Sequence, residues 1–289
     1  MQYGLMTYDI KKHFNVGDYI QSLAARQFLP QIDQYVNRER LDEYKGPKIK
    51  LIMNGWFMHH PEHWPPSSDV LPLFVSFHLT KRAAATVLDD EGVSYLKRFR
   101  VGARDTSTLK KLQEKGIDSY FSNCLTLTLG KSYPHRPGTE VYFVDVLHKW
   151  HFIGRRRRLL RKVFSDELID SATRIEHRRS GSAYPTEESR FELADQYLRL
   201  YQNAKLVVTS RLHCALPCLA MGTPVVFVDG WVRSKERNRF EGIRKMLNMV
   251  SFGGGQVQAN FDPDNVTVLD HHLPYVEQLE RRCEEFVPL

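Results

Sequence analysis

The chain has few cysteines and no long hydrophobic run, and these absences exclude several classes of protein. Its four cysteines lack the paired spacing of a zinc site: Cys124, Cys214, Cys218 and Cys283. We expect them to be reduced and buried, not disulfide partners or metal ligands. No apolar run approaches the roughly 20 residues that span a bilayer, and the first residues lack a signal-peptide pattern. We therefore expect a cytoplasmic protein.

Acidic residues are also in the minority, which gives the chain a formal net charge of +7. A positive excess favours an anionic ligand or surface. Much of the excess lies in the run Arg155–Lys162, which suits acidic glycans or lipid headgroups but is more often a solvated helix face. Peripheral contact with the inner membrane face through this run stays open. The sequence has no zinc-finger spacing and no RNA-binding aromatic signature, so we expect no nucleic-acid partner.

Strands and helices alternate along the 289 residues on both sides of one linker. The length exceeds that of a typical single domain. The polar stretch 130–139 is marked by proline and glycine and is the best linker in the chain. We therefore predict an α/β fold of two doubly wound domains that face a cleft, with boundaries 1–133 and 134–289. We also expect the closing helix, Pro274–Phe286, to pack back on the first domain.

Helix starts and stops are indicated by capping residues. Asp18 can cap the first helix, which runs to about residue 30, and Thr106 or Ser107 can cap a helix over 109–115. Further helices are expected over 187–204 and around 240–249.

The strongest functional signal is a predicted strand, helix and second strand over residues 205–228. Ser210, Arg211 and His213 fall where the first strand passes into the helix. Open α/β sheets bind ligands at that edge, and a helix N-terminus presents free N–H groups to an anion. Arg211 adds a planar fork suited to phosphate or carboxylate, and His213 can carry a proton near neutral pH. A structural ion pair of Arg211 and a half-buried His213 are the alternative.

Similar spots follow other predicted strands. Asn15, Gly17 and Asp18 come after the first strand and can approach a hydroxylated ligand, although a plain helix cap explains them equally well. They are not a dinucleotide fingerprint, because the spacing of glycines is absent. Arg104 follows a short strand beside a hydroxyl-rich helix start, where an anion site and a contact with Asp105 are about equally plausible.

These residues together resemble the polysaccharide pyruvyl transferase family. The resemblance covers nearly the whole chain and rests on segments in a fixed order: Asn15-x-Gly17-Asp18, Asn54–Phe57, Ser76–His78, Gly102-x-Arg104-Asp105, Cys124–Leu129, Ser210–His213 and Gly222–Pro224. It implies a glycosyltransferase-B-like pair of Rossmann-like domains, with the acceptor bound by the first and the donor by the second. It also implies transfer of the pyruvyl group from phosphoenolpyruvate to two sugar hydroxyls as a ketal, with release of phosphate and without cofactor or metal.

The resemblance also implies roles for single residues. It places Arg104, Arg211 and His213 in the donor site and Asp18 toward the acceptor. The chemistry of these residues, apart from the resemblance, makes His213 the general acid, and the positions of Ser210 and Lys235 after predicted strands make them further candidates for binding the donor. The acceptor, an oligosaccharide or lipid-linked sugar, is expected beside Asn15, Gly17, Asp18 and Trp56, with Asp18 as the partner or base of its hydroxyl. Phe14 stands where the family often has glycine.

Two other functions remain open from the residues. A glycosyltransferase of the same fold can use the Arg and His residues to hold the diphosphate of a nucleotide sugar. A non-catalytic protein can bind a glycan or membrane surface through Arg155–Lys162.

Overall fold

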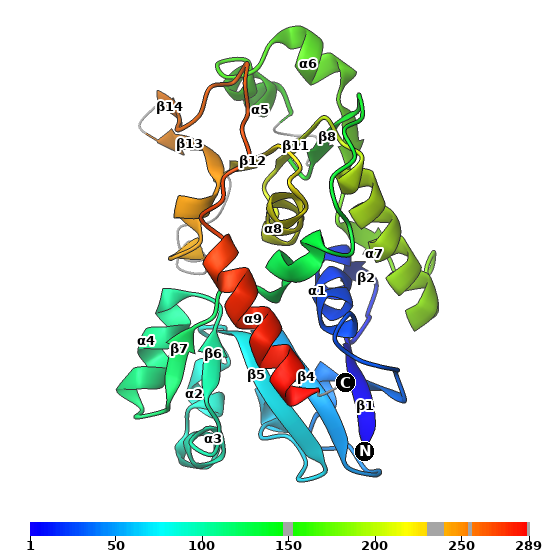
Figure 1. The fold of residues 1–289 in the computed structure, drawn as a ribbon, viewed down its shortest axis with the longest axis vertical. Coiled ribbons are helices and arrows are strands. Elements are labelled where there is room, and N and C mark those ends of the chain that lie inside the picture. The colour runs from blue at the N-terminus through cyan, green and yellow to red at the C-terminus, as the bar shows by residue number, and fades with distance from the viewer. Residues whose placement is uncertain (147–152, 230–239, 254–255, 288–289) are drawn as a thin grey trace.

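The computed structural model describes residues 1–146, 153–229, 240–253 and 256–287. Two six-stranded sheets form its frame, one in each half of the chain (Figure 1). The first has the order β3-β1-β4-β5-β6-β7 and is parallel throughout. Its strands are β1 Gln2–Thr7, β3 Gln34–Asn37, β4 Ile49–Phe57, β5 Val70–Leu79, β6 Val101–Ala103 and β7 Ser119–Phe121.

The second sheet has the order β14-β13-β12-β11-β8-β9 and is parallel except for its last pair, β13 and β14. Its strands are β8 Val141–Val144, β9 Thr173–Ile175, β11 Leu206–Thr209, β12 Val225–Val228, β13 Asn248–Gly253 and β14 Gln256–Ala259. Counted along the chain, both sheets place their second strand on one side of the first and all later strands on the other. This doubly wound order is consistent with a Rossmann-like fold and puts the switch points at β1/β4 and β8/β11.

Most of the helices between the strands lie where the sequence pattern predicts a helix. They are α1 Val16–Arg26, α2 Ala84–Val87, α3 Asp90–Leu96, α4 Thr106–Glu114, α5 Ile153–Leu160, α6 Asp166–Ser171, α7 Glu187–Gln202, α8 Leu212–Met221 and α9 Leu273–Phe286. Short 3-10 helices are η1 Arg38–Arg40, η2 Pro61–His63, η3 Leu125–Gly130 and η6 Arg244–Met246. No helix within the described ranges is both long and apolar enough to cross a membrane.

Three details differ from the sequence predictions. Asn15, not Asp18, caps α1, because its Oδ1 accepts from Gly17 N at 3.3 Å. Asp105, not Thr106 or Ser107, caps α4 through a bond of 2.9 Å from Thr108 N. The helix predicted around 240–249 is wrong: these residues form a turn, the 3-10 helix η6 and the start of β13.

Each half of the chain has a hydrophobic cluster of its own, and a further cluster of buried residues spans both halves. Buried residues of α1 pack with those of η3, α7 and α8, so the first helix of one sheet lies against helices of the other. A short antiparallel pair also joins the halves, β2 His13–Asn15 with β10 Arg178–Ser180. Helix α9 runs back across the first sheet (red in Figure 1), where Lys50 Nζ donates to the carbonyl oxygen of Phe286 at 2.6 Å. The four cysteines are buried and unpaired.

Candidate active site

A cavity of about 370 Å³ lies between the carboxyl ends of the two sheets. Trp56 at the end of β4 and Ser210 after β11 both line it, so it sits at the switch points of both sheets. Of the residues singled out from the sequence, it brings together Asn15, Gly17, Asp18, Trp56, Arg104, Ser210, Arg211 and His213. Lys235 lies outside the described residues.

The two halves come into close contact at Gly17. A Cβ atom built on Gly17 would lie 3.1 Å from the Cβ atom of His213 and 3.4 Å from the side chain of Asn15. The missing side chain therefore lets the start of α1 reach the start of α8. Asn15, which caps α1, also pairs with Arg178 of β10 and so fixes this junction from a second direction.

Asp18 is half-buried and lines the cavity. Its Oδ1 accepts hydrogen bonds from Trp56 Nε1 at 3.2 Å and from Gln21 Nε2 at 3.3 Å. Removal from water raises the pKa of this carboxyl, and the charge of Arg38 and the bond from Trp56 oppose the rise in part. A carboxylate with a raised pKa is a better proton acceptor than an exposed one.

Arg104 is almost completely buried, with 3% of its surface exposed, and it lines the cavity directly after β6. Its Nε has no hydrogen-bond partner among the described residues. Burial lowers the pKa of Arg104, and the acidic groups around it, Asp105 first, oppose this. Because a guanidinium stays protonated in proteins, Arg104 is a fixed buried charge with a free donor.

The sequence left open whether Arg211 forms a structural ion pair or faces a ligand, and the structure shows an ion pair on a side chain that also lines the cavity. Its Nε donates to Oδ2 of the buried Asp145 at 2.5 Å, and its side chain is still 37% exposed where it lines the cavity. Asp145 follows β8, and its Oδ2 also accepts from His177 N at 3.2 Å. The ion pair therefore orients the fork of Arg211 without burying it.

The first turn of α8 faces the same space. Arg211 is the N-cap of this helix, and its first two residues, Leu212 and His213, line the cavity wall. Unpaired N–H groups at a helix start favour an anion. His213 has φ −83° and ψ 23°, outside the helical range, at the point where α8 meets Gly17.

The structure adds His78 and Asp105 to the site. His78 lies in β5 and lines the cavity, and its Nδ1 is 2.6 Å from Oδ2 of the fully buried Asp105. Burial raises the Asp105 pKa, but the bond and charge of His78 and the charge of Arg104 outweigh this, so the pKa lies below its usual range. An ionised carboxylate accepts only, which places a proton on Nδ1 of His78. The sequence signal for this pair was the segment Ser76–His78, whose contact with Asp105 appears only once β5 and β6 are paired.

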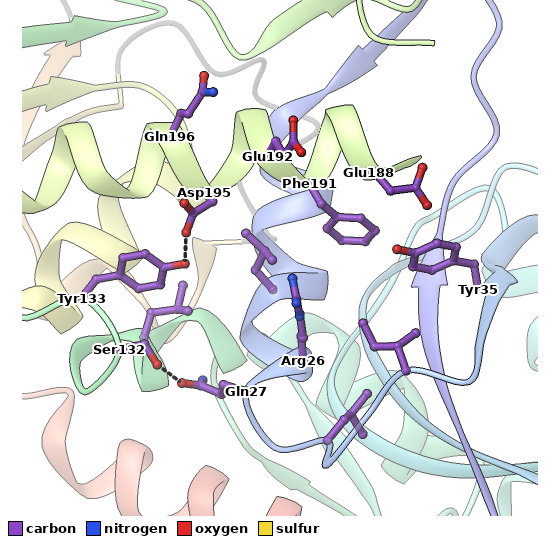
Figure 2. Close-up of a pocket in the computed structure, with 14 residues that line it drawn as sticks. Arg26, Gln27, Tyr35, Ser132, Tyr133, Glu188, Phe191, Glu192, Asp195 and Gln196 are labelled. Atoms are coloured by element: carbon purple, nitrogen blue, oxygen red, sulfur yellow. Dashed lines mark hydrogen bonds between the residues drawn. The ribbon is translucent and has the colours of Figure 1, made fainter. Parts of the chain in front are cut away.

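A larger cavity, about 760 Å³, lies elsewhere, between α1, η3 and α7 (Figure 2). Three carboxylates of α7 line it: Glu188, Glu192 and Asp195. Asp195 accepts a hydrogen bond from the hydroxyl of Tyr133 at 2.6 Å. Arg26 is its one cationic lining residue among those described. Its chemistry suits an anion poorly, and it contains none of the predicted site residues.

The arginine run and a group of surface histidines both find partners nearby. In the arginine run, Arg157 and Arg161 form ion pairs with Asp170 and Asp166 of the neighbouring helix α6. His60 and His63 contact Glu62 and Asp42 near the surface. Within the described ranges, no group of three or more His, Cys, Asp or Glu residues is arranged to hold a metal ion.

The comparison with family models decides the membership of the chain. Residues 86–230 match the model described as polysaccharide pyruvyl transferase. The chain belongs to this family. Membership in the polysaccharide pyruvyl transferase family implies a transferase of polysaccharide biosynthesis. Arg104, Arg211 and His213 fall within the matched residues, whereas Asn15, Asp18 and the rest of α1 precede them.

Known structures and curated sequences add little to this. A crystal structure of an uncharacterized protein from Klebsiella pneumoniae is similar, with a TM-score of 0.46 and 15% sequence identity over 82% of this chain and 87% of that one. No curated protein sequence matches the chain significantly.

Proposed function

We propose that the protein transfers the pyruvyl group of phosphoenolpyruvate to two hydroxyls of a glycan sugar as a ketal. The observation that carries this proposal is the single cavity shared by Arg104, Arg211 and His213. Phosphoenolpyruvate carries a phosphate and a carboxylate, so its site needs several fixed cations in a partly dry space. Arg104 supplies a buried donor, and Arg211 supplies an oriented fork.

The proposed donor site lies between two Rossmann-like domains in a glycosyltransferase-B-like arrangement. We place the division near residue 133, because the first sheet ends with β7 at Phe121 and the second begins with β8 at Val141. Residues of α1 and β4 then form the acceptor side. The residues after β11 form the donor side, together with Arg104 from the first domain.

The reaction begins with protonation of the donor. His213 gives a proton to the methylene carbon, which becomes the methyl group, and positive charge develops on the central carbon. The first acceptor hydroxyl attacks that carbon while its proton passes to the Asp18 carboxylate. The raised pKa of Asp18 suits it to this step.

The second half expels phosphate. The bond between the central carbon and the phosphate oxygen breaks, and His78, oriented by the bond from its Nδ1 to Asp105, donates a proton from its other ring nitrogen to the departing oxygen. The second hydroxyl attacks the same carbon and its proton returns to His213. The proton on Asp18 passes to solvent and His78 takes one back, so one hydroxyl proton ends in the methyl group and the other leaves with phosphate.

A donor panel tests this function by thermal unfolding. Ligands that bind only the folded state raise its melting temperature. We expect phosphoenolpyruvate to stabilise the wild type and Arg199→Met, a change at an exposed ion pair outside the cavity, but not Arg104→Met. Arg211→Lys keeps a charge for Asp145 but loses the fork, and should bind phosphoenolpyruvate more weakly. Stabilisation by a uridine or guanosine diphosphate sugar, with none by phosphoenolpyruvate, would support a glycosyltransferase instead.

A further inference from the structure

A second cavity opens directly beside the candidate donor site. It measures about 450 Å³ and shares five lining residues with the first: Asn15, Asp18, Trp56, His59 and Arg211. Shared walls on this scale make the two cavities neighbouring parts of one hollow. If phosphoenolpyruvate fills the first part, the second is the space from which a sugar hydroxyl reaches Asp18.

The lining of this second cavity carries more cationic than acidic side chains. Five cationic side chains border it, Lys11, Lys12, Arg38, Arg178 and Arg211, against two carboxylates, Asp9 and Asp18. Arg38 and Arg211 are ion-paired with Glu39 and Asp145, so the remaining cations of the lining are those to be weighed against the two carboxylates. Lys11, Lys12 and Arg178 are exposed, and the described residues provide no ion-pair partner for any of the three. An excess of positive charge, from Lys11, Lys12 and Arg178, therefore remains in the hollow.

Arg38 provides this cavity with a buried hydrogen-bond donor that its neighbours hold in place. It is 2% exposed, and its guanidinium carbon lies 3.8 Å from the centre of the Trp56 ring and 4.7 Å from that of Tyr8. Its Nη2 is paired with Glu39 Oε1 at 2.7 Å, and Glu39 Oε2 is fixed by the backbone N–H groups of His59 and His60. The Nη1 of Arg38 is buried without a hydrogen-bond partner. Buried donors without a partner are rare in native proteins, and one at a cavity wall suits a ligand oxygen.

We propose that this second cavity binds the acceptor, and that the acceptor sugar carries an anionic group, a phosphate or a carboxylate. Arg38 Nη1 donates to an oxygen of the acceptor, while Lys11, Lys12 and Arg178 attract its charge. A neutral glycan would leave this charge uncompensated, whereas a phosphorylated or acidic sugar matches it. The inference rests on the proposed function, because it assigns the acceptor of the same reaction.

The test measures binding, so that it does not depend on turnover. Sugar 1-phosphates and uronic acids of glucose, galactose and mannose are titrated calorimetrically against the matched methyl glycosides. We expect at least one anionic series to bind tenfold or more tightly than its neutral counterpart, with the preference falling as salt is raised. A preference for phosphates or for uronates identifies which group the acceptor carries. Equal binding of charged and neutral sugars, or no binding by any charged sugar, overturns the proposal.

Variants locate the effect. Arg38→Met should weaken binding of the anionic sugar about tenfold or more, with phosphoenolpyruvate binding unchanged. Because Arg38 is buried and this variant can fail to fold, Lys11→Met/Lys12→Met changes two exposed positions and should reduce the charge preference several-fold. Arg199→Met is the matched control and should change neither affinity. Unchanged sugar binding in the double lysine variant would overturn the assignment. A wild-type protein that binds the anionic sugar but not phosphoenolpyruvate would instead refute the proposed donor.

Discussion

Replacing Arg104 with methionine separates a ligand-binding arginine from a structural one. Arg104 is 3% exposed and its Nε has no partner among the described residues, so the folded protein without ligand holds a charge that it does not fully satisfy. An unsatisfied buried donor costs about 1–3 kcal/mol of stability, and methionine fills much of the same volume without that cost. Asp105 loses a favourable charge but keeps His78 and Thr108. We therefore expect Arg104→Met to be as stable as the wild type or more stable, by about 2–4 °C in melting temperature per kcal/mol gained.

The same change should remove donor binding. Truncating one partner of a buried charge pair costs about 2–5 kcal/mol, which weakens binding of phosphoenolpyruvate by about 30-fold to about 5,000-fold. Calorimetry and thermal unfolding on one preparation measure both effects. A variant that unfolds far below the wild type, or one that binds phosphoenolpyruvate normally, would show that Arg104 serves the fold and not the donor.

Three further variants test other parts of the site. Asp18→Asn should stabilise the protein more at pH 8 than at pH 5 in urea unfolding. The raised pKa of Asp18 means that the folded state binds its proton more tightly, so its contribution to stability is lost as pH rises through that pKa; a difference that does not vary with pH would contradict this. Gly17→Ala puts a methyl group 3.1 Å from the Cβ atom of His213 and should lower kcat about 100-fold with little change in melting temperature, measured by phosphate release. His78→Asn keeps a donor toward Asp105 but cannot transfer a proton, so kcat should fall by about 100-fold to 10,000-fold with phosphoenolpyruvate affinity retained; an unchanged pH profile would remove His78 from the mechanism.

Much of the frame could be predicted from the sequence because strands and helices leave local patterns. The buried strands β11 and β12 and the long helix α7 lie close to the ranges that hydrophobic periodicity indicates. The helix over 240–249 was predicted wrongly because the apolar residues there recur at helical spacing, as at Phe240, Ile243 and Leu247. The pairing of β13 with β12 is a distant contact that overrides this pattern.

The residues of the candidate site could likewise be predicted only where local sequence patterns position them. Ser210, Arg211 and His213 could be found because the strand-to-helix switch that positions them is local in sequence. His78 and Asp105 are 27 residues apart, and their contact depends on the alignment of Phe77 in β5 with Ala103 in β6. Arg38 belongs to no motif. Its place beside Trp56 follows from the order of β3, β1 and β4 in the sheet, which the sequence does not state.

A crystal structure with phosphoenolpyruvate bound tests the central claim most directly. The account predicts that the phosphate and carboxylate contact the guanidinium groups of Arg104 and Arg211, with the methylene carbon beside the imidazole of His213. Phosphoenolpyruvate bound away from these three side chains, or a nucleotide sugar that fills their cavity and is not displaced by phosphoenolpyruvate, would contradict it.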